Sequence, residues 1–211
     1  MKRGIFNLIL IAILLGLSFE GAADTTASAP KTVLVPLAET FEDTEAIPII
    51  SILRRAGAEV TVASLGERTV SSTRGLKVIA DRKLADCAKD KFDLIVLPGG
   101  MPAAQHLHDS KILKRLLIEQ NQHGKLYAAI CASPIVVLSP HGLLNGKRAT
   151  CYPSMSKSLA DSSDADKRVV VDGNCITSQG PGTAMEFALK LVESLYGTEK
   201  AEKLKKGYLV K

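Results

Sequence analysis

Short apolar runs rich in β-branched residues alternate along the chain with longer stretches in which apolar residues recur at helical spacing. The pattern predicts strands at 32–37, 59–65, 93–97 and 126–130, a β-ribbon at 69–72 with 76–80, and short late strands at 148–150, 168–171 and 175–177. It predicts helices at 43–57, 111–123, from 131 to about 140, and 182–196. Strands and helices therefore follow one another along most of the chain.

Such alternation is typical of βαβ units, in which helices cover both faces of a parallel sheet. We predict an α/β fold, a flavodoxin-like three-layer sandwich with a mostly parallel central sheet. A foldable length of about 180 residues suits one domain with a sizeable core. Ligands of such sheets bind at the carboxyl ends of the strands, which directs attention to residues 38–45, 98–101 and 131–134.

The first thirty residues follow a different pattern. Lys2 and Arg3 precede a short apolar stretch at 5–19, and small residues follow at 21–23. This arrangement predicts a signal peptide or signal anchor at 1–23, a polar linker at 24–31 and a folded domain at 32–211. We expect entry into the secretory route, to the periplasm, the endoplasmic reticulum lumen or the exterior. A bipartite organelle-targeting leader gives the same pattern.

Composition narrows the possible partners. Hydrophobic residues make up 46% and charged residues 23% of the chain, which excludes a disordered or collagen-like protein. Aromatic residues make up only 4%, with no Trp, and the net charge is a modest +5, so we expect no nucleic-acid partner. The lysines near the C-terminus are interpreted as a solvated helical face, and no stable membrane partner is expected once the leader is removed.

Cys131 is the most informative of the four cysteines. It lies in AAICASP, where a buried strand passes directly into a predicted helix. A tight turn at such a junction lifts a side chain clear of the sheet, and a helix N-terminus favours the thiolate. A packed core thiol is the alternative interpretation. Cys87, Cys151 and Cys175 are interpreted as structural, and no spacing indicates a metal site, although the even count permits two disulfides.

Two further stretches could meet Cys131 at the sheet edge. Glu45 belongs to a group of acids after the first strand, and burial beside a thiolate would drive it to keep its proton. A carboxyl group in that state can act as a general acid and then as a base. Gly99 and Gly100 allow backbone N–H groups to approach a ligand, and with the N–H of Ala132 they could form an oxyanion hole. A surface acid and a simple tight turn are the alternatives.

Five stretches carry a resemblance to the DJ-1/PfpI superfamily, and most closely to its DJ-1 branch with the bacterial YajL-type proteins: VLVPLAETFEDTEAIP, LRRAGAEVTVAS, FDLIVLPGGMPAA, LYAAICASP and TSQGPGTAMEFAL. The resemblance implies that Cys131 is an easily oxidised nucleophile, that Glu45 is its protonated partner, and that Gly100 and Ala132 supply backbone donors. It implies a homodimer that uses no metal and no organic cofactor. Gly99 is assigned to substrate binding. Arg74 and Pro181 match positions that lie near the site across the family's dimer, and they are assigned to substrate binding as well.

The sequence departs from the family at two positions. Tyr152 stands where DJ-1 itself has a His, so a hydroxyl replaces an imidazole at a position that we assign to substrate binding. Ala132 stands where PfpI-type peptidases have a His, so this chain lacks the Cys–His dyad that attack on an amide requires. Peptidase activity is therefore not expected.

The resemblance implies a cysteine-dependent, glutathione-independent glyoxalase or protein deglycase, which acts on methylglyoxal, glyoxal and their early adducts. The alternative is a redox-sensing, chaperone-like protein in which Cys131 is oxidised to a sulfinate. Both functions use the same residues. A structural domain that keeps the turn without turnover is a third interpretation.

Overall fold

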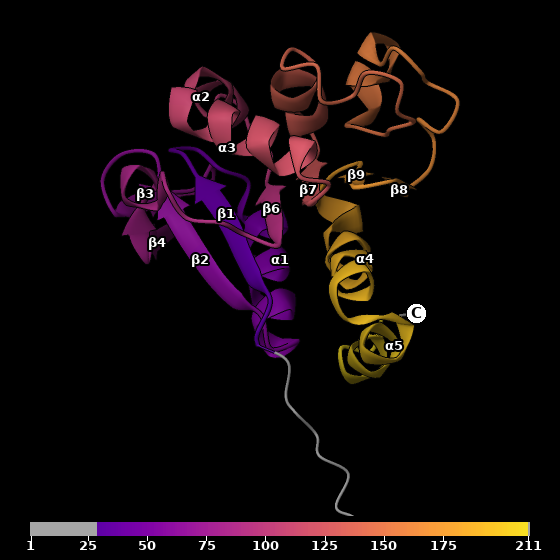
Figure 1. Ribbon diagram of the computed structural model, residues 1–211, viewed down its shortest axis with the longest axis horizontal. Coiled ribbons are helices and arrows are strands. Elements are labelled where there is room, and N and C mark those ends of the chain that lie inside the picture. Colours follow the sequence, from indigo (N-terminus) through magenta and orange to yellow (C-terminus); the bar gives the residue numbers. More distant parts are fainter. Residues whose placement is uncertain (1–28, 211) are drawn as a thin grey trace, which may run out of the picture.

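A seven-stranded sheet in the order β5-β2-β1-β6-β7-β9-β8 forms the centre of the computed structural model, which describes residues 29–210 (Figure 1). All neighbouring strands are parallel except β8, which runs antiparallel to β9. The strands are β1 (Thr32–Leu37), β2 (Glu59–Ser64), β5 (Arg82–Lys83), β6 (Leu94–Leu97), β7 (Leu126–Ile130), β8 (Val169–Asp172) and β9 (Cys175–Ser178). The predicted strands of the parallel sheet are confirmed.

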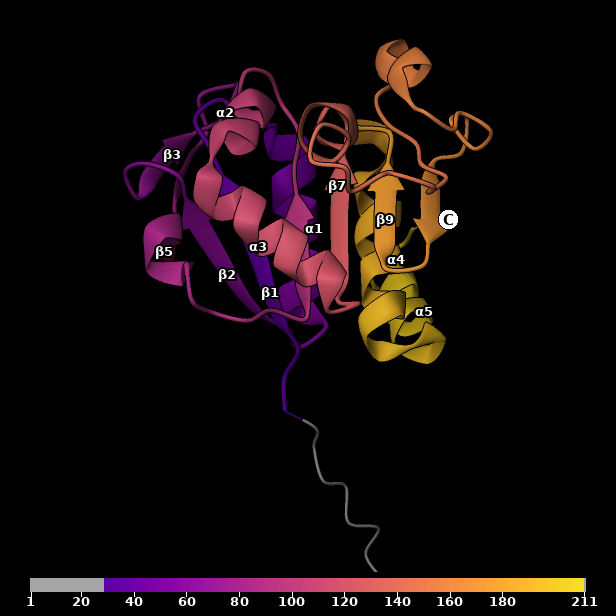
Figure 2. The same ribbon diagram turned by 45° about the horizontal axis from the view of Figure 1, so that its top comes forward.

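Helices cover both faces of this sheet, so the expected three-layer sandwich is confirmed (Figure 2). On one face α1 (Asp43–Arg55) packs against α4 (Ala184–Tyr196), which in turn contacts α5 (Thr198–Gly207). On the other face lie α2 (Ala103–Asp109) and α3 (Lys111–Gln122). Four short helical segments complete the fold: η1 (Leu84–Cys87), the π-helical η2 (Pro134–Leu138), η3 (Pro153–Ser158) and η4 (Pro181–Thr183).

The central strands are apolar because both of their faces are covered. Every residue of β6 is buried, and β1 and β7 are buried from their second residue onward. The helices show an apolar stripe instead, as in α3, where Leu113, Leu116 and Leu117 are buried and the intervening residues mostly face water. These two patterns of burial explain why continuous apolar runs and helically spaced apolar residues alternate along the sequence.

The structure differs from the prediction at 148–150, which is not a strand. The N–H of Thr150 donates to Oγ1 of Thr177 at 2.9 Å, and the Thr150 hydroxyl donates to the carbonyl oxygen of Ala165 at 2.8 Å. Side chains thus take the place of a strand partner for this segment. The stretch after Cys131 is helical only as the short η2, and β5, α2 and α5 add to the predicted elements.

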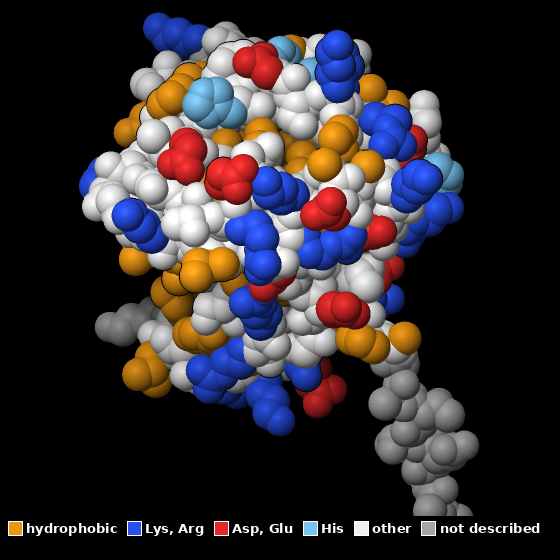
Figure 3. Space-filling view, turned by 90° about the vertical axis from the view of Figure 1, so that its left-hand side faces the viewer, with side chains coloured by type: hydrophobic (Ala, Val, Ile, Leu, Met, Phe, Trp, Pro, Cys, Tyr) orange, Lys and Arg blue, Asp and Glu red, His pale blue; other side chains and the backbone are white. Residues whose placement is uncertain are grey.

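The predicted ribbon forms a separate hairpin of β3 (Thr69–Ser71) and β4 (Lys77–Ile79) beside the sheet. Two of its apolar side chains face solvent, Leu76 with 49% and Ile79 with 72% of their surface exposed. Figure 3 views the molecule from this side, where hydrophobic side chains lie among interspersed basic and acidic ones.

Three other expectations concern chemistry and location. The cysteines, all within residues 29–210, are unpaired thiols. The C-terminal lysines lie on α5 as predicted, for example Lys200 and Lys203, which are exposed. The expected leader at 1–23 lies outside the described residues. Among the helices of residues 29–210, none has the length and apolarity needed to cross a membrane.

Candidate active site

Three loops that follow neighbouring strands meet at the carboxyl edge of the sheet. The strands β1, β6 and β7 lie side by side, and the chain leaves each of them toward the same edge because they are parallel. The loop after β1 leads into α1 with Glu45, the loop after β6 contains Gly99 and Gly100, and β7 is followed directly by Cys131. The topology therefore brings together residues that are far apart in the sequence.

Cys131 has a left-handed backbone conformation with φ +66°, which is uncommon for a residue with a side chain. Two backbone hydrogen bonds hold it there. Its N–H donates to the carbonyl oxygen of Ser178 at 3.0 Å, and its carbonyl oxygen accepts from the N–H of Tyr152 at 2.8 Å. The sharp turn leaves the side chain half-buried rather than enclosed in the core, as the strand-to-helix junction predicts.

Glu45 is fully buried in the first turn of α1. Its Oε2 accepts a hydrogen bond of 2.7 Å from the N–H of Gly99, and its Oε1 has no hydrogen-bond partner within the described residues. Burial raises the pKa of this carboxyl group from 4.5 to about 7; the hydrogen bonds with Cys131 and Gly99 lower it and the charge of Glu42 raises it. The expected buried acid is therefore present beside the cysteine.

The pKa of Cys131 is raised to about 12, first by burial and then by the negative charge of Glu45. Hydrogen bonds from the N–H groups of Gly100 and Ala132 act in the opposite direction. The N–H donor at the start of the following π-helical turn therefore acts in the expected direction, but burial and the charge of Glu45 outweigh it. Because burial raises both pKa values and the charge of Glu45 raises that of Cys131 further, the pair loses its two protons in separate steps and holds one shared proton between them.

Gly99 is required by the closeness of the pair. A Cβ atom at this position would lie 2.6 Å from Cβ of Cys131 and 2.7 Å from Oε2 of Glu45. Gly100 has φ +98°, and a Cβ atom there would lie 2.7 Å from the backbone N of Glu42. Both glycines let the loop after β6 approach α1 and the cysteine closely enough to donate its N–H groups.

The residues expected to bind the substrate, Tyr152, Pro181 and Arg74, lie in different parts of the structure. The half-exposed Tyr152 packs its ring over Gly180, 3.3 Å from the position of a Cβ atom there, and Oε1 of Glu45 lies 3.9 Å from the same point. Pro181 is the next residue and is exposed. Arg74 lies in the turn of the β3–β4 hairpin, where its guanidinium is 3.9 Å from the Glu42 carboxylate.

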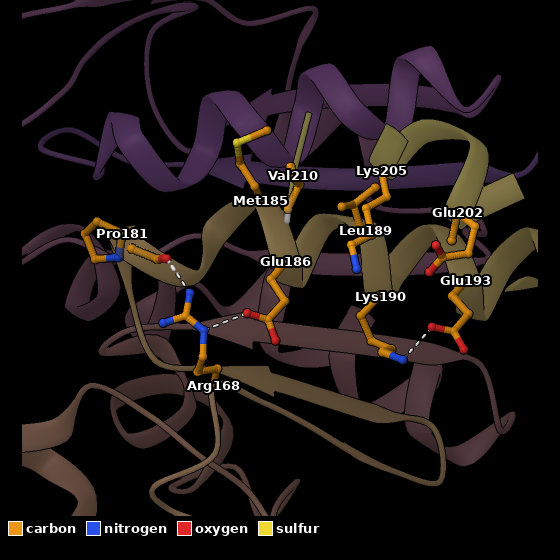
Figure 4. A pocket seen from close by; sticks show the side chains of 12 residues that line it. Arg168, Pro181, Met185, Glu186, Leu189, Lys190, Glu193, Glu202, Lys205 and Val210 are labelled. Atoms are coloured by element: carbon orange, nitrogen blue, oxygen red, sulfur yellow. Dashed lines mark hydrogen bonds and ion pairs between the residues drawn. The ribbon is translucent and has the colours of Figure 1, made fainter. Parts of the chain in front are cut away.

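A cavity of about 660 Å³ lies away from Cys131, along α4 and α5, and Pro181 forms part of its wall (Figure 4). Four of its charged side chains form two ion pairs: Arg168 contacts Glu186 at 2.7 Å, and Lys190 contacts Glu193. The charges of these two ion pairs are neutralised within each pair, so they are not available to bind a charged ligand. We place the chemistry at the cysteine.

Comparison with known proteins identifies the group to which this geometry belongs. The model of the DJ-1/PfpI family matches residues 31–194. The chain belongs to the DJ-1/PfpI family. It is 47% identical over 194 residues to Protein DJ-1 homolog B of Arabidopsis thaliana, which covers 92% of this chain and 42% of that protein. The chain thus spans less than half the length of this relative.

Two further relatives of this DJ-1/PfpI chain match over nearly their whole length. The Glutathione-independent glyoxalase DJR-1.2 of Caenorhabditis elegans is 37% identical, over 85% of this chain and 96% of that protein. The solved structure of oxidized DJ-1 from Toxoplasma gondii is 45% identical, with a TM-score of 0.83 over 85% of this chain and 98% of that chain. The resemblance seen in the sequence is confirmed.

Sequence reasoning missed two contributors to this DJ-1/PfpI site. Gly180 lies against both the Tyr152 ring and Glu45, and Ser133 donates a buried hydrogen bond of 2.6 Å to the carbonyl oxygen of Pro98. Gly180 stands in the recognised stretch TSQGPGT, so its glycine was a usable signal. Nothing local to Ser133 indicates that it ties the loop after β6 to the turn after β7.

Proposed function

We propose that the protein is a cysteine-dependent, glutathione-independent glyoxalase and protein deglycase, which acts on methylglyoxal, glyoxal and their early adducts. The observation that carries this proposal is the placement of the buried Glu45 beside Cys131, with two backbone N–H groups directed at the sulfur. A relative that is named a glutathione-independent glyoxalase supports it. The PfpI-type alternative, peptide hydrolysis, is disfavoured because Ala132 provides no imidazole.

The shared proton belongs on Glu45 in the reactive state. The side chain of Cys131 is only partly buried and receives hydrogen bonds from Gly100 and Ala132, whereas the carboxyl group of Glu45 is fully buried and accepts a single backbone N–H. Negative charge is better stabilised at the site with more donors and more contact with water. Oε1, which has no partner in the described part of the chain, is then free to donate its proton to a substrate.

The reaction of methylglyoxal follows from these positions. The thiolate of Cys131 adds to the aldehyde carbon, and the proton of Glu45 passes to the resulting oxyanion to give a hemithioacetal. The carboxylate of Glu45 then removes the proton on that carbon and delivers it to the neighbouring carbon, while the hydroxyl proton of the hemithioacetal moves to the ketone oxygen. The ketone thus becomes an alcohol and the adduct becomes a thioester. Water hydrolyses the thioester to lactate and the thiolate of Cys131, which releases two protons: one returns to Glu45 and the other leaves with the lactate.

Lactate formation from methylglyoxal in the absence of glutathione tests this proposal. The full chain is expected to form lactate, and Cys131→Ser is expected to reduce formation to background. Cys87→Ser is the matched control, because Cys87 is buried away from Glu45 and a serine hydroxyl can donate to the same carbonyl oxygen of Lys83. Turnover that survives in Cys131→Ser, or its absence from the unaltered chain, would contradict the proposal.

A redox-sensing, chaperone-like role is the second candidate. The N–H groups of Gly100 and Ala132 and a protonated Glu45 could hold a sulfinate on Cys131 as well as an oxyanion. Glu45→Gln separates the two roles, because the enzyme needs a carboxyl group that gives and takes a proton, whereas a sensor still oxidises. Selective oxidation of Cys131 by mild peroxide, without any lactate formation by the unaltered chain, would favour the sensor.

Assembly and location are further parts of the proposal. A homodimer is supported by the exposed Leu76 and Ile79 on the hairpin that also carries Arg74. The mass of the assembled protein by light scattering tests it, and a monomer at working concentration would contradict it. Secretory targeting by residues 1–23 rests on the sequence pattern, and the N-terminal sequence of the protein recovered from cells tests it.

A further inference from the structure

Two histidines stack face to face where the end of α2 meets the turn that follows η2. The ring centroids of His108 and His141 are 4.7 Å apart, and their planes are inclined by only 13°. His108 lies in the last turn of α2, and His141 lies in the turn that follows η2. The stack therefore joins two segments that are more than thirty positions apart in the sequence.

Neither ring is fully satisfied by its surroundings. Nδ1 of His108 and Nε2 of His141 are buried without a hydrogen-bond partner in the described residues. The charged groups that act on His141 are cationic: His108 from α2 and Lys114 from α3. Asp109, which adjoins His108, accepts a hydrogen bond from Gln105 instead. No negative charge within the described residues is among the groups that act on His141 to compensate its protonation.

The stack is unsuited to a metal ion. The lone pairs of imidazole nitrogens lie in the ring planes, so those of two nearly parallel rings do not converge on one ion. Residues 29–210 contain no cluster of three or more side chains that could hold a metal. The geometry instead provides a ring-to-ring contact between two titratable side chains.

Each of the two joined segments holds one of the backbone donors of the site. The carbonyl oxygen of Gly100 accepts the N–H of Ala104 in α2 at 2.9 Å. The carbonyl oxygen of Ala132 accepts the N–H of Val136 in η2 at 2.8 Å. Each donor residue is thus bonded to α2 or η2 through its own carbonyl group, in the peptide unit next to the donating N–H, and these two elements also contact each other.

We propose that His108 and His141 form a proton-sensitive clamp, which sets the spacing of α2 and η2 and hence the positions of the Gly100 and Ala132 donors, and which acid releases. The two histidines are positioning residues. The effect of release on catalysis rests on the function proposed above, whereas the release itself does not.

The direction of the pH response follows from the charges. Burial, and then the charges of His108 and Lys114, lower the pKa of His141 below its ordinary 6.5, while a hydrogen bond with the His108 backbone opposes this. A histidine whose pKa is lowered by folding contributes stability above its unfolded pKa, and this stability is lost as the pH falls below about 6.5. The contact between α2 and η2 is therefore expected to weaken in acid.

Hydrogen–deuterium exchange of the full chain tests the clamp, read on peptides that cover 100–110 and 132–143 and corrected for the intrinsic effect of pH. Two unit charges 4.7 Å apart repel each other in water strongly enough to shift the opening equilibrium about fivefold. Exchange in both peptides should therefore rise about fivefold between about pH 8 and about pH 5.5. His141→Gln and His108→Gln should each abolish most of that rise. The matched control is His106→Gln, an exposed histidine on the same helix.

A rise that is absent from the unaltered chain, or one that persists in both variants, would overturn the clamp. Should a variant fail to fold, the histidine ring signals of the unaltered chain in an NMR titration give the answer directly. His141 should protonate below the pH of an ordinary exposed histidine, together with a change in the signals of the 100–110 backbone. Neither readout involves lactate, so failure of the clamp and failure of the proposed enzyme are separate results.

Discussion

Replacing Glu45 by Gln is expected to stabilise the fold at neutral and alkaline pH while it abolishes turnover. The side chain is fully buried, and the pKa of its carboxyl group rises from 4.5 to about 7. The folded chain therefore holds this proton more tightly than the unfolded chain does. The resulting contribution to stability is complete below about pH 4.5 and is lost as the pH rises through about 7.

The magnitude follows from the two pKa values. A tenfold change in a proton equilibrium corresponds to about 1.4 kcal/mol, so the interval from 4.5 to about 7 corresponds to about 3 kcal/mol. The result does not depend on which group of the Glu45–Cys131 pair keeps the remaining proton, because only the number of bound protons enters. A neutral amide of the same shape can still accept the N–H of Gly99 and carries no such penalty.

Denaturant unfolding at a series of pH values measures this effect. The difference in unfolding free energy between Glu45→Gln and the unaltered chain should grow by about 3 kcal/mol in favour of the variant from about pH 4.5 to about pH 8. Glu59→Gln is the matched control, since Glu59 is exposed and its substitution should leave the pH profile unchanged. A difference that stays constant with pH would refute the burial argument.

Three further substitutions probe the packing of the site. Gly99→Ala should abolish lactate formation and lower stability by about 1–3 kcal/mol through overpacking. Gly66→Ala, with nothing within 4 Å of its Cβ position, should change neither. An active Gly99→Ala variant would contradict the close approach of Gly99 to Cys131 and Glu45. Ser133→Ala should cost about 1–3 kcal/mol, measured by denaturant unfolding, because the buried carbonyl of Pro98 loses its donor. Tyr152→Phe should leave the melting temperature unchanged and raise KM for methylglyoxal with little change in kcat; unchanged kinetics would remove its hydroxyl from substrate binding.

Cys131 shows most clearly which properties the neighbouring residues predict and which depend on residues far away in the sequence. The residues around it, a buried strand followed at once by small residues and Pro134, were enough to predict a sharp turn that exposes the thiol. The same residues indicate the N–H donor at Ala132, but not the burial and the charge that outweigh it. The pKa depends on burial and on Glu45, which lies 86 positions earlier in the chain and reaches the sulfur only through the order of strands in the sheet.

By itself the sequence determined the alternation of strands and helices, and with it the parallel sheet and the edge where a site can form. Periodic apolar residues report local conformation and burial, which are properties of short segments. The tertiary structure decided what those segments meet: the pairing of Thr150 with Thr177 in place of a strand, and the stack of His108 on His141. Contacts of this kind depend on the packing of segments distant in the chain, and no local pattern encodes them.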